Sequence, residues 1–188
     1  MKLKELESLM QVANSYDEFD RQIVIDLGCG TAMLGIGAAM LGARHVVGID
    51  VDADALETAQ ANIAEYEEDL PIDLVQCDVR QLAPQTRLHA DTVITNPPFG
   101  TRRKGADLEF LRAAFRLSRR SIYSLHKSST RDHIRRVALR ELGAVEAEVL
   151  AQLRYDLPAS YAFHKLKSKD IEVDLWRFEV PAREGSEV

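Results

Sequence analysis

The chain has 188 residues, which suits one compact domain and is too short for two full ones. Apolar residues make up 46% of it and charged residues 29%, a balance typical of globular proteins and not of disordered chains. The net charge of −6 argues against indiscriminate binding of polyanions. The longest strongly apolar stretch, residues 33–41, is too short to span a bilayer, and the charged start is not typical of a signal peptide. We therefore expect no membrane as a partner.

The two cysteines bear on metal binding and on the redox compartment. Cys29 and Cys77 form no metal-ligand pattern and suggest no disulfide framework. The sequence thus predicts no metal site in this chain and favours an intracellular, reducing compartment.

The predicted elements alternate between strands and helices along most of the chain. Seven β-rich runs predict strands at residues 23–27, 45–49, 72–76, 91–95, 121–125, 146–153 and 171–180. Helical spacing, caps and glycine stops predict helices at residues 31–41, 53–66, 108–117 and 131–142. This alternation predicts an α/β fold with a doubly wound, mostly parallel sheet. We divide the chain into a lead-in (1–22), one domain (23–180) and a tail (181–188).

A glycine-rich loop follows the first predicted strand at residues 26–35. Gly28 and Gly30 allow a tight turn and a close approach of the backbone to a ligand. Amides at the start of the following helix favour a carboxylate. Met33 stands where a nicotinamide-binding loop would carry its third glycine, so the pattern is Asp-x-Gly-x-Gly-x-x-x-x-Gly.

Such a loop resembles the first motif of S-adenosylmethionine methyltransferases. The resemblance implies S-adenosyl-L-methionine as the cofactor and assigns Asp26 to organising the loop. It also implies that the backbone near Thr31 and Met33 lines the methionine part of the cofactor.

Acidic residues end the next two predicted strands. A carboxylate at Asp50 could accept both ribose hydroxyls of a nucleoside, although this residue alone would equally suit NAD. Asp78 could accept from an adenine amino group, with Cys77 and Val79 flanking the ring. Either acid could instead cap a helix, because Asp is favoured at helix starts.

The fourth predicted strand runs into Asn96, Pro97, Pro98 and Phe99. The two prolines remove two amide donors, so the backbone presents carbonyls, and the Asn96 side chain adds another oxygen. These acceptors could hold both hydrogens of an amino group and stabilise the charge that develops on its nitrogen during methyl transfer. Phe99 could stack on a planar base. The alternative is an ordinary proline turn. The motif is similar to that of methyltransferases acting on adenine N6, guanine N2 or glutamine amide nitrogen.

About nine-tenths of the chain resembles the methyltransferase-like five family of small-subunit ribosomal RNA adenine-N6 methyltransferases. The resemblance implies a Rossmann-like class I fold with seven strands and an antiparallel last strand, and activity on 18S ribosomal RNA in the nucleus, nucleolus and cytoplasm. It also implies a heterodimer with a small zinc-binding activator protein that pairs with a sheet edge such as residues 72–76. The segments that carry it are residues 26–30, 39–43, 75–79, 96–101, 123–131, 154–161 and 171–175.

One segment of the family pattern is absent. Residues 2–9 and 14–20 resemble two family segments that a longer stretch normally separates. That stretch holds a Gln-Tyr-x-Thr motif which closes over the cofactor. Its absence predicts fewer contacts to the cofactor and less exclusion of water.

Basic residues concentrate in one part of the chain. Residues 101–140 hold twelve Lys and Arg against three Asp and Glu. A solvated helical face would explain this, and so would a contact with RNA. His126 also lies at a predicted strand end in this region. Our candidates for RNA binding are Arg102, Arg103, Lys104, Lys127, Arg131, Lys165 and Lys167.

Two other functions remain open from the sequence. A protein glutamine methyltransferase would use the same Asn-Pro-Pro-Phe pocket on an amide. A cofactor-binding or scaffold protein without activity would fit the shortened N-terminal region.

Overall fold

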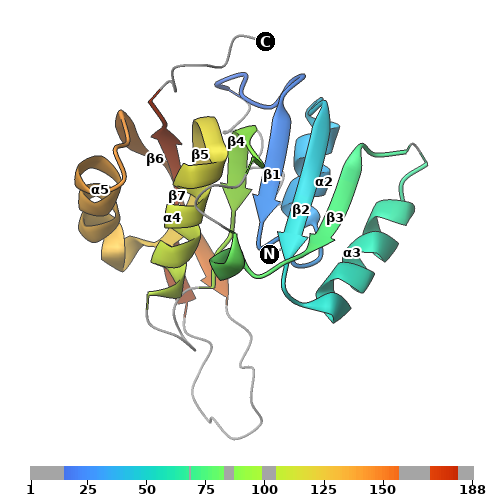
Figure 1. Ribbon diagram of the computed structural model, residues 1–188. Helices are drawn as coiled ribbons and strands as arrows, with labels where there is room; N and C mark the ends of the chain where they lie inside the picture. Colours follow the sequence, from blue (N-terminus) through green and yellow to red (C-terminus); the bar gives the residue numbers. More distant parts are fainter. Residues whose placement is uncertain (1–14, 68, 83–86, 99–104, 157–169, 182–188) are drawn as a thin grey trace, which may run out of the picture.

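The computed structural model describes residues 15–67, 69–82, 87–98, 105–156 and 170–181. A seven-stranded sheet crosses the centre of the molecule in the order β3-β2-β1-β4-β5-β7-β6 (Figure 1). Its strands are β1 (Ile23–Leu27), β2 (His45–Asp50), β3 (Ile72–Gln76), β4 (Ala90–Thr95), β5 (Ser118–Lys127), β6 (Glu146–Asp156) and β7 (Asp170–Glu179).

Only β7 runs against its neighbours. The pairs from β3 through β5 are parallel, whereas β7 is antiparallel to both β5 and β6. The predicted doubly wound sheet and antiparallel last strand are therefore confirmed. Because β1 to β5 are parallel, their carboxyl ends meet at one edge of the sheet, where such folds bind ligands.

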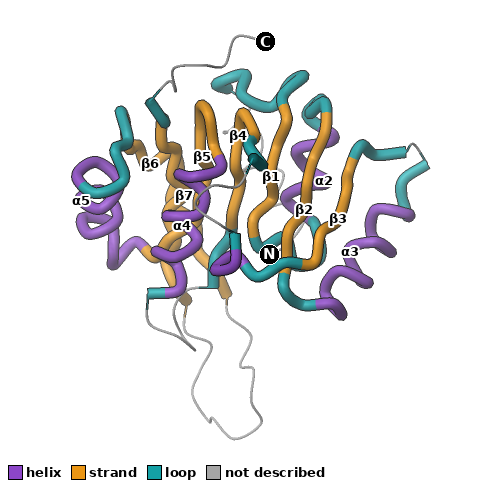
Figure 2. The backbone as a smooth tube through the Cα atoms, in the orientation of Figure 1, coloured by secondary structure: helices purple, strands orange, loops and turns teal. Residues whose placement is uncertain are grey.

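Helices cover both faces of the sheet (Figure 2). They are α2 (Met33–Met40), α3 (Ala53–Ala64), α4 (Ala106–Leu117) and α5 (Arg131–Arg140), with short 3-10 turns η1 (Val79–Gln81) and η2 (Ser128–Thr130). Apolar residues of α4 and α5 share one core cluster with one face of the sheet, and Ala38 of α2 belongs to the cluster on the other face. Successive side chains of a strand point to opposite faces of the sheet and so contribute to both core clusters. In β7, Trp176 and Phe178 pack on one face and Val173 and Leu175 on the other.

Some predicted boundaries were wrong. The first helix begins at Met33 and not at residue 31, because Ala32 adopts a left-handed φ of 61°. β5 begins at Ser118, three residues before the predicted start, where exposed Arg119 and Arg120 interrupt the apolar pattern. The fourth helix ends at Arg140, since the chain turns before Gly143, whose φ is 78°.

The described part of the lead-in packs onto the domain. Phe19 is fully buried against the core and lies 5.3 Å from the Tyr123 ring, centre to centre. The Glu18 carboxylate accepts from the Arg177 guanidinium at 2.6 and 3.1 Å and from the Tyr123 hydroxyl. These contacts join the lead-in to β5 and β7. The predicted boundary at Ile23 therefore marks the start of the first strand, but residues on both sides of it pack into the same core.

Within the described ranges, no helix is both long and apolar enough to cross a membrane.

Candidate active site

The loop after β1 turns at its glycines and is held by the end of β2. Gly28 and Gly30 adopt positive φ angles of 73° and 52°. The amides of Gly28 and Cys29 donate to the Ile49 carbonyl at 2.7 and 3.0 Å. An amide that binds a ligand must therefore lie closer to the start of α2.

Asp26 lies beneath this loop and is completely buried. Its Oδ2 accepts from the Gly35 amide at 2.8 Å, and its Oδ1 has no partner among the described residues. Burial raises the pKa of Asp26 to about 7, reinforced by the charge of Asp50 and opposed by the Gly35 hydrogen bond. A Cβ at Gly35 would lie 3.2 Å from Oδ2, so glycine permits this approach. The Asp26 carboxylate thus connects β1 to α2 through the hydrogen bond from Gly35.

Cys29, in the same loop, is a packing residue. Burial, together with the charges of Asp26 and Asp50, raises the pKa of its thiol to about 12. A neutral, buried thiol is not a nucleophile.

Asp50, at the end of β2, bridges the glycine loop and the start of α3. Its Oδ2 accepts from the Gly30 amide at 2.8 Å, and its Oδ1 accepts from the Asp52 amide at 3.0 Å. An ionised carboxylate offers about four acceptor positions, so two remain for ligand hydroxyls.

Asp78, after β3, is already engaged by a neighbouring cation. Arg80 Nε donates to both carboxylate oxygens at 2.9 and 3.0 Å, and Arg80 Nη2 forms a further ion pair with Oδ2. The Arg80 amide also donates to Oδ1, so Asp78 caps η1. An adenine amino group would have to share this carboxylate with the guanidinium. The capping alternative therefore applies at Asp78, and the sequence did not reveal the ion pair.

The chain leaves β4 at Asn96, beside a cavity of about 720 Å³. The Thr95 hydroxyl donates to the Leu27 carbonyl at 2.7 Å and fixes the end of β4 against β1. Asn96 Oδ1 is buried and accepts no hydrogen bond within the described residues. Pro97 is buried, and Pro98 is exposed on the cavity wall. A buried amide oxygen without a donor favours a ligand that brings an N–H group.

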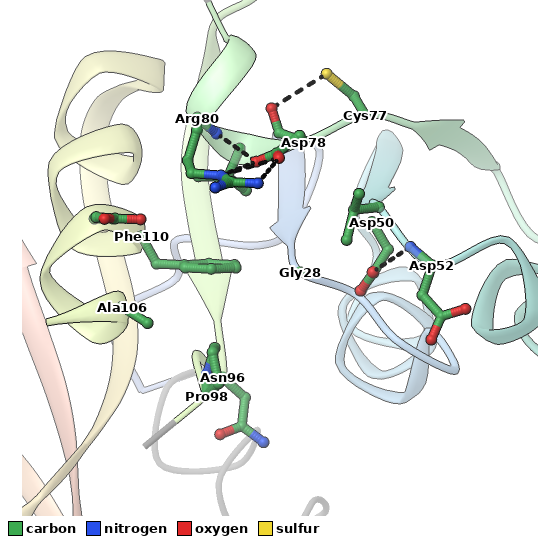
Figure 3. Close-up of a pocket in the computed structure, with 13 residues that line it drawn as sticks. Gly28, Asp50, Asp52, Cys77, Asp78, Arg80, Asn96, Pro98, Ala106 and Phe110 are labelled. Carbon is green, nitrogen blue, oxygen red and sulfur yellow. Dashed lines mark hydrogen bonds and ion pairs between the residues drawn. The ribbon is translucent and has the colours of Figure 1, made fainter. Parts of the chain in front are cut away.

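The cavity joins the ends of β1 to β4 with the first turns of α4 (Figure 3). The structure thus brings together loops from four strands that are far apart in the sequence. Seven predicted site residues line it: Gly28, Asp50, Cys77, Asp78, Val79, Asn96 and Pro98.

Phe110 is the main lining residue that sequence reasoning missed. Its ring projects from α4 toward Gly28 (Figure 3), so that a Cβ built on Gly28 would lie 2.5 Å from the Phe110 Cε1. Phe110 was assigned only to the predicted helix 108–117, and no local signal distinguishes a cavity aromatic from a core one. The other missed lining residues are Val51, Asp52, Arg80, Ala106 and Glu109.

Comparison with known proteins gives matches over nearly the whole chain. The chain is 45% identical to the zebrafish (Danio rerio) rRNA N(6)-adenosine-methyltransferase METTL5, covering 95% of this chain and 99% of the relative. It is 49% identical to the Drosophila melanogaster Mettl5 of the same name, covering 89% and 78%.

The chain belongs to the METTL5 family of rRNA N6-adenosine methyltransferases. Membership confirms the expected enzyme class and S-adenosylmethionine as the methyl donor. The zebrafish alignment runs over 208 positions, more than the 188 residues of this chain, so that METTL5 has residues which this chain lacks.

A solved structure is similar to this chain over most of its length, in agreement with the METTL5-family assignment. A model of a second methyltransferase family matches the first half of the chain. PH1948 of Pyrococcus horikoshii, described as an RNA methyltransferase, superimposes with a TM-score of 0.78 at 32% identity, covering 94% of this chain and 83% of that one. The family model of ribosomal protein L11 methyltransferase (PrmA) matches residues 1–97. That match ends within the Asn-Pro-Pro-Phe motif, so it spans the cofactor loops and stops before α4.

The cavity residues fit the cofactor of a METTL5-family enzyme. Asp50 keeps two acceptor positions for hydroxyls. Gly28 has no side chain, so its backbone itself lines the cavity. A side chain at this position would collide with Phe110.

Other predicted residues of this METTL5-family chain lie away from the cavity or are already paired. Thr31 is exposed and its carbonyl accepts from Asn62, and Met33 packs against the core cluster on the α2 face. Arg131 forms a double hydrogen bond of 2.7 Å with buried Asp174. Lys127 is half-buried at the end of β5.

His126 is completely buried, which rules out the contact with RNA that its position suggested. Its Nε2 lies 2.9 Å from Ser124 Oγ, and its Nδ1 lies 3.6 Å from an oxygen of Asp107 at the start of α4. That contact with His126 lowers the pKa of Asp107.

Several predicted residues lie outside the described residues: Phe99, Arg102, Arg103, Lys104, Lys165 and Lys167. Within the described ranges, no group of His, Cys, Asp and Glu could hold a metal ion.

Proposed function

We propose that this chain transfers the methyl group of S-adenosylmethionine to N6 of an unpaired adenine in small-subunit (18S) ribosomal RNA. Family membership supports the reaction class. The observation that carries the assignment to this cavity is the buried, unpartnered Asn96 oxygen at the end of β4.

Asn96 and the adjoining backbone carbonyls would hold the two amino hydrogens of the base. The bound cofactor supplies an electrophilic methyl group. Acceptors that grip both N–H groups help to localise the nitrogen lone pair, and they bind more strongly as positive charge develops. The rigid attachment of β4 to β1 through Thr95 keeps these acceptors beside the cofactor loop.

The test is an Asn96→Ala variant with labelled cofactor and small-subunit rRNA. We expect methylation to fall by about 10²–10³-fold while cofactor affinity is retained, because the lost oxygen acts on the acceptor nitrogen. Gln60→Ala on the exposed side of α3 is the control. Near-normal turnover by Asn96→Ala would remove the assigned role.

Nucleoside mass spectrometry of the product decides between the proposed function and its rivals. N6-methyladenosine in small-subunit rRNA supports the proposal, whereas label in glutamine side chains supports a protein methyltransferase. Absence of cofactor binding would support a scaffold without activity.

We also propose that a small zinc-binding activator protein pairs with the edge strand β3. The outer side of β3 has no neighbouring strand in the described sheet, and Val75 and Val51 are exposed beside it. An uncovered apolar edge favours strand addition. Val75→Asp should abolish co-purification of the activator. The matched change Val145→Asp, at the opposite edge by β6, should not; equal loss in both would contradict the edge assignment.

The nucleus, nucleolus and cytoplasm are the compartments that we propose for such an enzyme. Imaging of a tagged chain in its own cells tests this.

A further inference from the structure

Arginines gather on the outer sides of α4 and α5, outside the cavity. We call this set the α4–α5 basic face, and it consists of Arg112, Arg116, Arg135, Arg136 and Arg140. Both helices pack on the same face of the sheet, so their outer sides form one surface (Figure 1). Arg112 of α4 lies 3.5 Å from Glu141 after α5, and the Arg135 guanidinium lies 5.6 Å from the ring centre of Trp176 in β7. The first contact joins the two helices, and the second joins α5 to the sheet.

The basic face shares α4 with the cavity. Phe110 and Glu109 on the first turns of α4 line the cavity. Arg112 and Arg116 follow on the same helix, and Arg116 lies roughly 9 Å beyond Phe110 along the axis, at 1.5 Å per residue. The face therefore begins one turn after Glu109, on the helix that forms one wall of the cavity.

Positive charge predominates on these two helices. Together with Glu141, α4 and α5 carry six Arg against four Asp and Glu, in a chain whose net charge is −6. Among the described residues, Arg112 is the one member of the face with a carboxylate within 4 Å. Arg135, Arg136 and Arg140 are exposed, and Arg116 is partly so. Clustered like charges raise the energy of the folded state, and within the described ranges no carboxylate lies within 4 Å of Arg116, Arg136 or Arg140 to offset this cost.

The chemistry of the cluster matches phosphate. Every member of the face is arginine, whose planar guanidinium binds phosphate oxygens with two parallel hydrogen bonds. Chemistry on a base requires the base to leave its stack, and the flanking RNA must then be held by its backbone. Proteins recognise RNA duplexes mainly through shape and phosphate contacts.

We infer that the α4–α5 basic face binds the sugar–phosphate backbone of a helical arm of the substrate RNA, next to the target adenine. This inference rests on the proposed function. It separates two parts of recognition: the cavity selects the base, and the face holds the structured RNA around it.

The test compares two triple variants that each remove three positive charges. The face variant is Arg116→Gln, Arg136→Gln and Arg140→Gln. The control variant is Arg21→Gln, Arg44→Gln and Arg87→Gln, which are all exposed and lie outside α4 and α5 in the sequence. Each protein is titrated with full-length small-subunit rRNA over a range of salt concentrations. Cofactor affinity and methylation of a short single-stranded oligonucleotide around the modified adenine are measured in parallel.

We expect the face variant to lose roughly tenfold or more in rRNA affinity and to reduce the slope of log K against log salt by about 2–3. Its cofactor affinity and its activity on the short oligonucleotide should match the wild type, and the control variant should keep full rRNA affinity.

Equal weakening in both triples would overturn the inference, since net charge would then explain the binding. If the wild type methylates rRNA and the face variant keeps unchanged rRNA affinity, the inferred RNA-binding role of the face is overturned and the proposed function remains intact. A wild type that does not methylate rRNA would instead overturn the function itself.

Discussion

At Gly28, the absence of a side chain decides whether the cofactor loop can lie against α4. The residue has a φ of 73°, and the Phe110 ring occupies the space that a Cβ would need. Backbone conformation and packing therefore both demand glycine here.

Gly28→Ala should reduce cofactor affinity at least tenfold, because Phe110 and the loop must move apart. Backbone strain adds a loss of about 1–2 kcal/mol in the free energy of unfolding. Gly143→Ala is the matched control, since Gly143 has a similar φ of 78° and open space around it. It should lose stability but keep cofactor affinity, measured by calorimetric titration and urea unfolding. Equal cofactor affinity in Gly28→Ala and the wild type would contradict the prediction.

The buried Asp26 predicts a pH dependence of stability. Its folded-state pKa of about 7 lies above the 3.8 of an unfolded aspartate, so the folded state holds the proton more tightly. The stabilisation is fully present below about pH 4 and is lost as the pH rises through about 7.

Asp26→Asn keeps the shape and an oxygen that can accept from Gly35, but it cannot ionise. We therefore expect the melting temperature of this variant to change less between pH 5 and pH 8 than that of the wild type. Parallel pH profiles for the two proteins would contradict the assignment.

At the scale of elements, the lead-in is fastened to the sheet by a buried ion pair. Glu18 and Arg177 are each less than a tenth exposed, and Glu18 also accepts from Tyr123. Burial and the hydrogen bond to Glu18 raise the pKa of the Tyr123 hydroxyl, which therefore stays protonated as a donor.

Glu18→Ala should lower the free energy of unfolding by about 3–5 kcal/mol, because Arg177 would remain buried without its main partner. Glu146→Ala is the control, since this carboxylate is more than half exposed and lies 3.4 Å from the same guanidinium. It should cost less than about 1 kcal/mol. Urea denaturation of both variants measures the difference, and a similar cost for the two changes would count against the buried pair.

Local patterns predicted the strands well and the side-chain partners poorly. β1 and β3 have the predicted bounds because β-rich runs between turn residues mark strands directly, although β3 is an edge strand and not the buried strand that the pattern indicates. Arg131 looked like an RNA contact, yet its partner Asp174 lies forty-three residues away and is visible only after folding. The Arg80 ion pair with Asp78 and the position of the Phe110 ring in the cavity were missed for the same reason. Each depends on the direction of a side chain, which the spacing of residues in the sequence does not reveal.

At the scale of the whole molecule, the cofactor should stabilise the fold through contacts that join separate strands. Cofactor at one hundred times its dissociation constant adds about 2.7 kcal/mol to the free energy of unfolding. We expect this rise in the wild type and in Asn96→Ala. It should be largely lost in Asp50→Ala, where the Gly30 and Asp52 amides lose their shared acceptor. Thermal unfolding with and without cofactor measures it, and full stabilisation of Asp50→Ala would contradict the role of that carboxylate.

The two walls of the cavity come from separate stretches of chain. The loops after β1 to β4 end at Pro98, and the opposite wall begins at Ala106, the first residue of α4. The likeness to ribosomal protein L11 methyltransferase stops at residue 97, at this same seam. Because the α4 wall belongs to a separate stretch of chain, changes in that stretch can alter which substrate fits without disturbing the loops that face the methyl donor.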